Sequence, residues 1–205
     1  MYETSRLLIS QSYQHWISQE LFSTGWFLII GLLIVVYGVW FKLVDKSNLR
    51  NLLLLGSLYA VGFGLSTIIL EGYYGFWEFA VRITPLKPTI FTLSYTVAPI
   101  LYMTVVQYNT SWKSFLLWAS IGTAVISFGI VPIYVMLGIL KLLRGFNYFY
   151  AFIYLLTGGI IGRAIYLWIA SIEQNQLASN RATQSFPGLQ PSAAKPLPKD
   201  DDKKD

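Results

Sequence analysis

The sequence predicts an all-α fold: a polytopic transmembrane helical bundle of about five spans, with an N-terminal interfacial amphipathic helix and a disordered C-terminal tail. The first reason is composition, because 55% of the 205 residues are hydrophobic and only 12% are charged, whereas a soluble domain is about 25% charged. The second is that apolar stretches of roughly 18 residues or more recur, each long enough to cross a hydrocarbon layer about 30 Å thick. The third is that most charges fall between these stretches. We therefore expect an interfacial helix (1–22), a transmembrane domain (23–172) and a polar, Pro-rich tail (173–205).

The N-terminal segment has the pattern of a helix that lies on a bilayer. Ile9, Tyr13, Trp16 and Ile17 recur at three- or four-residue intervals, and Ser and Gln residues lie largely opposite them. A helix with one apolar and one polar face is typical of the headgroup layer. His15 is the only histidine in the chain, and it has no second His or Glu at metal-ligand spacing, so we expect no metal site.

The spans are predicted from apolar length and from the breaks between them. They are expected at about 26–41, 51–70, 88–108, from 114 onward, and 148–168. Pro132 should kink or end the fourth span, because proline removes a backbone donor. The segment "KLLRG" should form a short connection to the fifth span, and five crossings would place the two termini on opposite sides of the membrane.

Small residues at four-residue spacing predict where helices pack closely. Gly56, Ala60 and Gly64 lie four apart in the second span, and Gly158 and Gly162 repeat this spacing in the fifth. Such spacing leaves one helix face nearly bare, so that a neighbouring helix can approach. We interpret these residues as helix-packing positions.

The stretch "EGYYGFWEFAVR" (71–82) places charged side chains among aromatic rings. If it is helical, Glu71, Glu78 and Arg82 share one side, and Glu78 can pair with Arg82. One interpretation is a polar ligand site facing the bundle, because charges at membrane depth usually have a function. The other is an interfacial anchor with the aromatic rings in the headgroup layer. We favour the anchor, because the span length places Glu71 at the membrane boundary.

Further polar residues lie within the predicted spans. Arg163 lies five residues before Trp168, so we expect its guanidinium either to extend to the headgroups or to pair with an internal carboxylate or carbonyl group. A contact with a substrate anion is the alternative. In the third span Tyr95, Tyr102 and Gln107 are candidate ligand-lining residues, although such side chains mostly bond to neighbouring helices.

Several classes of function are excluded or unsupported. The chain has no cysteine, which excludes disulfides, thiolate catalysis and Cys-based metal sites. It has no P-loop and no dinucleotide-binding glycine pattern, so no cofactor is expected. The net charge of +5 is scattered between apolar segments, which argues against nucleic acid and for anionic lipid.

Three stretches, "WFKLVDKSNLRNLLL", "APILYMTVVQYNTSWKSF" and "YVMLGILKLLRG", together resemble an uncharacterised family of small multi-pass membrane proteins from bacilli and clostridia. The resemblance covers about residues 40–168. It implies a bacterial cytoplasmic membrane and a bundle of about five helices, and it brings no activity and no catalytic residue.

Three hypotheses of function follow from the sequence. The first is a non-catalytic membrane protein that organises lipid or partner proteins, either as a homo-oligomer or with another membrane protein. The second is a carrier or binding protein for a small molecule or lipid, in which Glu71, Glu78, Arg82 and Arg163 converge. The third is a membrane-embedded enzyme acting on lipid, for which Glu71 and Glu78 are the candidate acid and base.

Orientation is not fixed by the basic residues near the span ends, because they divide equally between the two sides. The lysines of the tail favour a cytoplasmic C-terminus. They are Lys195, Lys199, Lys203 and Lys204.

Overall fold

The structure, a computed structural model of the chain, describes residues 2–85 and 93–184, and it places the side chains of 9–85 and 95–177. About 81% of it is helical, which confirms the predicted all-α class. The chain divides into two compact units, Met1–Tyr166 and Leu167–Asp205. The first unit contains the helical bundle.

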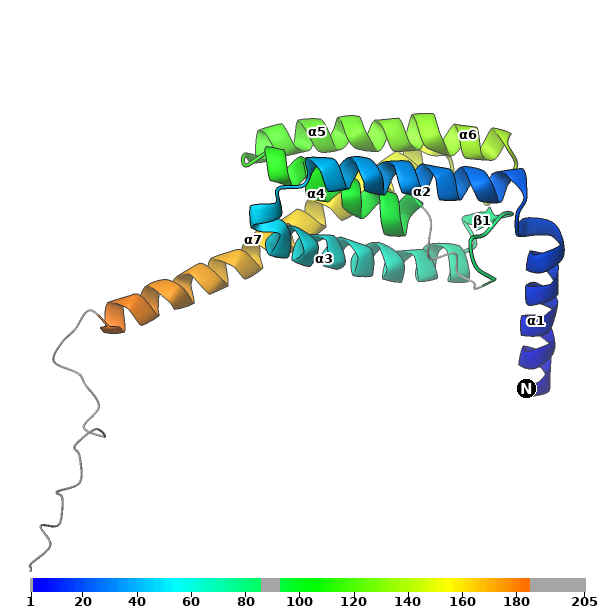
Figure 1. The fold of residues 1–205 in the computed structure, drawn as a ribbon, viewed down its shortest axis with the longest axis horizontal. Coiled ribbons are helices and arrows are strands. Elements are labelled where there is room, and N and C mark those ends of the chain that lie inside the picture. Colours follow the sequence, from blue (N-terminus) through cyan, green and yellow to red (C-terminus); the bar gives the residue numbers. More distant parts are fainter. Residues whose placement is uncertain (1, 86–92, 185–205) are drawn as a thin grey trace, which may run out of the picture. The chain divides into compact units, whose positions relative to one another are not determined.

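The first half of the bundle consists of an N-terminal helix and two long antiparallel helices (Figure 1). The elements in order are α1 (Tyr2–His15), the π-helical turn η1 (Trp16–Glu20), α2 (Thr24–Leu43), the 3-10 turn η2 (Lys46–Asn48), α3 (Leu49–Thr67) and the π-helical turn η3 (Ile68–Tyr73). The Ser23 side chain accepts a hydrogen bond from the Trp26 amide and so caps α2. Asp45 caps η2 in the same way, through the Ser47 amide.

The second half contains one short helix, a long broken helix and the C-terminal helix. The elements are β1 (Trp77–Phe79), η4 (Leu93–Val97), α4 (Ala98–Tyr108), α5 (Trp112–Ala124), η5 (Val125–Ile130), α6 (Val131–Met136), β2 (Leu140–Leu142) and α7 (Tyr148–Gln184). The prediction that Pro132 disturbs the fourth span has a structural counterpart, because the helix takes π geometry at η5 immediately before this proline.

Four helical segments in the described part of the chain are long and apolar enough to cross a membrane: Thr24–Leu43, Lys46–Tyr73, Trp112–Met136 and Tyr148–Leu177. The predicted third span differs from these. Its first residues fall outside the described part, and in the described remainder the five residues of η4 continue directly into the 11 of α4. The described residues therefore show four of the predicted spans at full length, and the length of the third stays a prediction.

The short helix α4 lies at the centre of the bundle and packs against α2, α3 and α5. Its Ala98 and Tyr102 have no exposed surface. The Tyr102 ring stacks on Tyr59 of α3, with 4.9 Å between ring centroids, and the Phe115 ring of α5 is fully buried beside it.

The predicted small-residue faces are sites of close packing, but side chains and not backbones fill them. A Cβ atom at Gly56 would meet Met103, and one at Gly64 would meet Tyr95. On α7 the rings of Phe63 and Tyr59 occupy the positions of a side chain at Gly158 and Gly162, respectively. Ala60 is half-buried on the same helix as Gly56 and Gly64. Gly159, which the spacing argument missed, faces the Tyr102 ring in the same manner.

The helical interpretation of residues 71–82 is wrong. Helical geometry ends at Tyr73, Gly75 has a φ of +63°, and Trp77–Phe79 forms an antiparallel pair with Leu140–Leu142. Gly75 adopts this left-handed conformation without the steric cost of a side chain. The predicted connection "KLLRG" is therefore partly strand β2.

Helix α7 continues to Gln184, past the predicted start of the tail at residue 173. The residues after Trp168 contain no Gly or Pro before Gln184, and extending an existing helix avoids the cost of a new nucleus. The remainder of the predicted tail, 185–205, lies outside the described residues.

Candidate functional site

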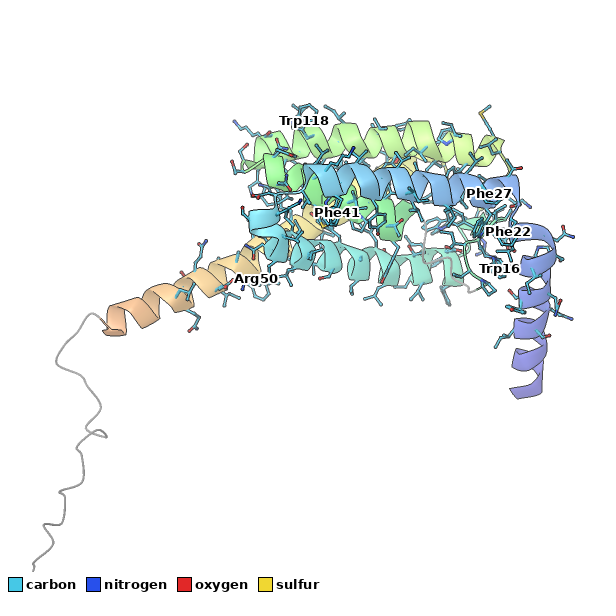
Figure 2. All side chains as sticks on the ribbon, in the orientation of Figure 1. Trp16, Phe22, Phe27, Phe41, Arg50 and Trp118 are labelled. Carbon is cyan, nitrogen blue, oxygen red and sulfur yellow. The ribbon has the colours of Figure 1, made fainter. Side chains whose placement is uncertain are left out.

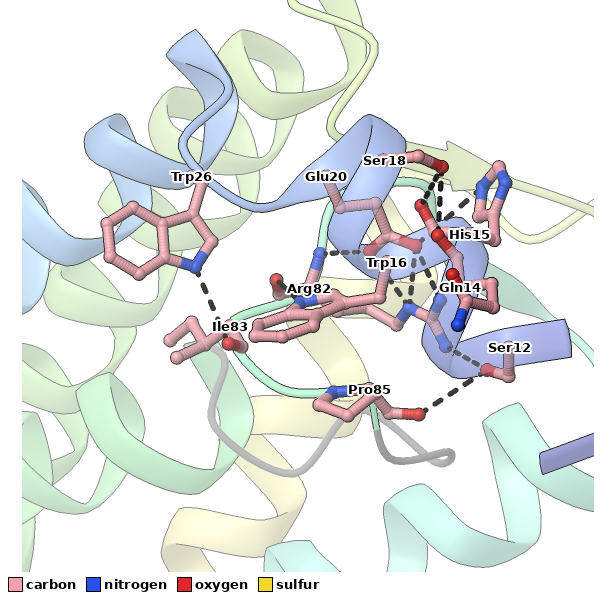
Figure 3. Close-up of polar contacts among 10 residues, drawn as sticks. All are labelled: Ser12, Gln14, His15, Trp16, Ser18, Glu20, Trp26, Arg82, Ile83 and Pro85. Atoms are coloured by element: carbon pink, nitrogen blue, oxygen red, sulfur yellow. Dashed lines mark hydrogen bonds and ion pairs between the residues drawn. The ribbon is translucent and has the colours of Figure 1, made fainter. Parts of the chain in front are cut away.

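A buried ion pair lies at the end of the bundle where α2 begins, which we call the Arg82 end (Figure 3). The guanidinium of Arg82 donates from Nη2 to Oε1 of Glu20 (2.5 Å) and from Nε to Oε2 (2.9 Å). The Arg82 amide donates to the same carboxylate at 2.8 Å. The two residues are only 3% and 2% exposed, respectively, so the pair is shielded from water.

Neighbouring side chains attach the loop 80–85 to the N-terminal helix and to α2. The Trp16 indole donates to the Arg82 carbonyl at 2.9 Å, and the Trp26 indole to the Ile83 carbonyl at 3.4 Å. The Ser12 hydroxyl accepts from Nη1 of Arg82 at 3.3 Å and lies 3.4 Å from the Pro85 carbonyl, to which it donates. Three elements, α1, η1 and α2, thus hold one loop.

The other two acidic candidates lie elsewhere at the same end of the bundle. Glu71 accepts a hydrogen bond from the Trp77 indole at 3.1 Å. Glu78 is exposed on β1, directly opposite Lys141 of β2 in the strand register. The predicted pairing of Glu78 with Arg82 is not found, because the strand geometry replaces the helix that would have brought them together, and Arg82 pairs with Glu20.

Arg163 lies at the opposite end of the bundle, which we call the Arg163 end. It donates from Nη1 to the Asn109 carbonyl (3.1 Å) and from Nη2 to the Thr110 carbonyl (2.6 Å). Its guanidinium carbon also lies 4.4 Å from the ring centre of Phe115 and 5.0 Å from that of Trp112. Arg163 therefore takes internal carbonyl partners, one of the outcomes expected from the sequence.

The two arginines are separated by the length of α2. Glu20 immediately precedes this helix, whereas its last turn is held by Gln107, which bonds the Asp45 amide and the Leu43 carbonyl. The 20 residues of α2 span about 30 Å. The expected convergence of Glu71, Glu78, Arg82 and Arg163 on one site is thus not found, because Arg163 lies at the other end.

The remaining candidates of the third span are engaged within the bundle. The Tyr102 hydroxyl donates to the Leu155 carbonyl at 2.7 Å and lies 3.0 Å from the Thr123 hydroxyl. Tyr95 packs its ring against Gly64, and Gln107 joins α4 to the end of α2. Their predicted ligand-lining role stays a prediction.

A groove of about 330 Å³ separates α3 from the first half of α7. Its floor includes the rings of Tyr59 and Phe63, and Gly62 lies at its edge. At one end the hydroxyls of Ser66 and Tyr154 bond to each other at 2.7 Å. The other lining residues are apolar: Leu58, Val61, Gly158, Ile161, Gly162 and Ile165.

These arrangements limit the chemistry that the site can perform. Both carboxylate oxygens of Glu20 accept hydrogen bonds from Arg82, and Glu20 is only 2% exposed, so a substrate has little access to this carboxylate. Among the described residues, no group of three His, Asp or Glu side chains could hold a metal ion. The charged groups fix the loops of the bundle, whereas the open space of the α3–α7 groove is apolar.

The sequence analysis predicted Glu78 as the partner of Arg82 and missed Glu20. Glu20 and Arg82 are 62 positions apart, and periodicity reports only neighbours along one helix. One available signal was that Glu20 lies near the apolar face of an amphipathic segment, where an acidic residue needs a partner.

No known protein family, curated protein sequence or solved structure matches the chain. The function must therefore be inferred from the bundle itself.

Proposed function

We propose that the chain is a non-catalytic integral membrane protein that organises lipid in a bacterial cytoplasmic membrane. The observation that carries this proposal is the apolar α3–α7 groove, which lies between two membrane-spanning helices. A groove at this position is filled by hydrocarbon, because its lining offers little to hydrogen-bond water. Its Ser66 and Tyr154 hydroxyls already bond to each other, so the groove suits a lipid chain without a polar group at that depth.

The buried charges support a structural role over catalysis or transport. Arg82 and Arg163, 3% and 2% exposed, respectively, bond to internal partners at opposite ends of the bundle. A carrier that binds an anion needs a cation with free donors facing a cavity. An acid/base enzyme needs a carboxylate within reach of bound substrate. Glu20 and Arg82 are engaged with each other. Arg163 keeps one buried donor, Nε, without a partner among the described residues, but Arg163 does not line the α3–α7 groove.

The test is retention of lipid by the purified protein. Gly62 lines the groove, and an added Cβ there meets nothing within 4 Å, so Gly62→Leu should fill the groove without disturbing the core. Gly38→Leu is the matched control, because Gly38 on α2 is equally open and lies outside the groove. Native mass spectrometry of protein released from membranes should show a bound lipid in wild type and in Gly38→Leu, and less of it in Gly62→Leu. Equal lipid retention in all three proteins would contradict the proposal.

We further propose that the Arg163 end faces the cytoplasm. Basic residues at that end lie in the last turn of α2, in η2 and at the start of α3 and α5, namely Lys42, Lys46, Arg50 and Lys113. Figure 2 shows Arg50 at this end and Phe22 at the other. Helix α7 reaches the Arg163 end, where Arg163 bonds the Asn109 carbonyl, before the C-terminal sequence begins. The lysines of that sequence, Lys195, Lys199, Lys203 and Lys204, therefore favour the same side as the inside.

The absence of cysteine allows a direct test of this orientation. Single substitutions Tyr73→Cys at the Arg82 end and Thr110→Cys at the Arg163 end both lie at exposed positions. A membrane-impermeant maleimide should label Tyr73→Cys in intact bacterial cells and Thr110→Cys only after permeabilisation. The reverse pattern would show the opposite orientation.

A further inference from the structure

The N-terminal helix carries an apolar stripe that the described protein does not cover. Ile9, Tyr13 and Ile17 are 69%, 47% and 43% exposed, respectively. Their four-residue spacing places them along one side of the α1–η1 helix. Single exposed apolar residues are common on protein surfaces and need no explanation. The stripe indicates a binding surface only if the rest of the protein fixes the direction in which it points.

The adjacent face of the same helix fixes that direction. Ser12, Trp16 and Glu20 also follow a four-residue spacing, and each bonds to the loop 80–85. Glu20 does so through the buried ion pair with Arg82, and Trp16 through its indole to the Arg82 carbonyl (Figure 3). Three attachments along one face prevent rotation about the helix axis. The apolar stripe is therefore held in one direction relative to this loop.

The corner between η1 and α2 provides an independent observation. Phe22 has a φ of +60°, a conformation that a bulky residue rarely adopts, and such strain persists only where surrounding contacts enforce it. The corner brings the Phe22 ring to 5.3 Å from Trp26 and 6.2 Å from Phe27, between ring centroids. Phe22 and Phe27 are 67% and 57% exposed, respectively, and Figure 2 shows both at the same end of the bundle.

This aromatic cluster lies at the start of a membrane-spanning helix, because α2 begins at Thr24. Aromatic residues collect at the level where hydrocarbon meets headgroups. Only three residues separate η1 from α2, so the stripe ends next to the aromatic cluster at the start of this span.

We propose that the apolar stripe of α1 docks into the headgroup layer of the bilayer that α2 crosses, and that the Glu20–Arg82 ion pair sets the rotation of α1 that makes this contact. The partner is lipid and not a second copy of the chain, because the stripe adjoins the lipid-facing aromatic cluster at the membrane boundary. A helix with an apolar face of this kind lies in the interface plane with that face buried among the acyl chains near the headgroups. The proposal does not depend on the α3–α7 groove.

The experiment uses the full cysteine-free chain in liposomes. An NBD fluorophore is attached at Ile17→Cys on the stripe or at Gln11→Cys, an exposed polar position two residues from both Ile9 and Tyr13 and so on the other side of the same helix. Quenching by a nitroxide-labelled lipid is compared with quenching by iodide in the water. The lipid quencher should act more strongly at position 17, and iodide more strongly at position 11. Equal quenching at the two positions, or protection of position 17 from both quenchers, would overturn the docking proposal.

The role of the ion pair is tested by adding Glu20→Gln to both labelled proteins. The difference between positions 17 and 11 should shrink, because a neutral amide no longer forms an ion pair with the guanidinium. Glu173→Gln makes the same chemical change at an exposed position of α7 and should leave the difference unchanged. A circular dichroism spectrum of each protein checks that the bundle is folded, so a persistent difference in folded Glu20→Gln would overturn the assigned role of the pair.

Discussion

Replacing Arg82 with Gln should destabilise the folded bundle strongly, because it leaves the Glu20 carboxylate buried without its cation. Glu20 is 2% exposed and would keep only the 2.8 Å bond from the backbone amide of residue 82. It would lose the contacts from Nε and Nη2 at 2.5–3.2 Å. Breaking a buried ion pair from one side costs about 3–5 kcal/mol, which corresponds to a change on the order of 10²- to 10⁴-fold in the unfolding equilibrium.

This effect can be measured by denaturant titration in detergent micelles with tryptophan fluorescence as the signal. Trp16 reports directly on the region, since its indole bonds to the Arg82 carbonyl. Arg144→Gln is the matched control, because Arg144 is exposed at the same end of the bundle, and surface changes usually stay within about 0.5 kcal/mol. In the double variant Glu20→Gln/Arg82→Gln neither position carries a buried charge. The losses in unfolding free energy of the two single variants should therefore be non-additive by about 0.5–3 kcal/mol. If Arg82→Gln cost less than about 1 kcal/mol, the value typical of an exposed pair, the ion pair would be solvated and the reasoning refuted.

Other changes should have distinct effects. Arg163→Lys should lower the free energy of unfolding by about 1.5–3 kcal/mol in the same titration. An ammonium lacks the planar guanidinium that bonds two carbonyls and stacks on rings. An unchanged unfolding midpoint would argue against this contact. Gly159→Leu should lower the free energy of unfolding by about 1–3 kcal/mol, because the added side chain collides with the Tyr102 ring. A decrease no greater than that of Gly38→Leu would contradict the close packing of Gly159 against Tyr102. Hydrogen bonds from the Ser47 hydroxyl and amide lower the pKa of Asp45 below its usual 3.8. The resulting stabilisation is fully present above pH 3.8, and it disappears as the pH falls through the lower pKa of the folded state. Unfolding midpoints of wild type and Asp45→Ala should therefore differ at pH 7 and converge in acid; a difference independent of pH would refute this.

The membrane-spanning helices were predictable because each depends on local information. Apolar length alone placed both ends of the helix Thr24–Leu43, and the start of the helix Trp112–Met136, to within a few residues. The packing role of Gly158 and Gly162 was also visible, since an uncovered helix face invites a neighbour. The identity of that neighbour was not visible, because the rings of Phe63 and Tyr59 come from a helix about 100 positions earlier.

The features that sequence reasoning missed join segments far apart in the chain. Strand β1 is three residues long and pairs with β2, so that Glu78 lies opposite Lys141. Three residues carry too little alternation to reveal a strand. The ion pair between Glu20 and Arg82 likewise joins the last residue of η1 to a loop 62 positions later. Residues 71–82 favoured a helix when considered alone, and the pairing of β1 with β2 replaces that helix.

The two buried arginines should leave different marks on related sequences. Arg82 bonds to a side chain, so a relative that loses one member of the pair at position 82 or 20 should have lost or exchanged the other as well. Arg163 bonds to main-chain carbonyls, which every residue type supplies at positions 109 and 110. Arg163 can therefore stay invariant while both of its partner positions drift freely, and covariation between sites would reveal the first arginine and overlook the second.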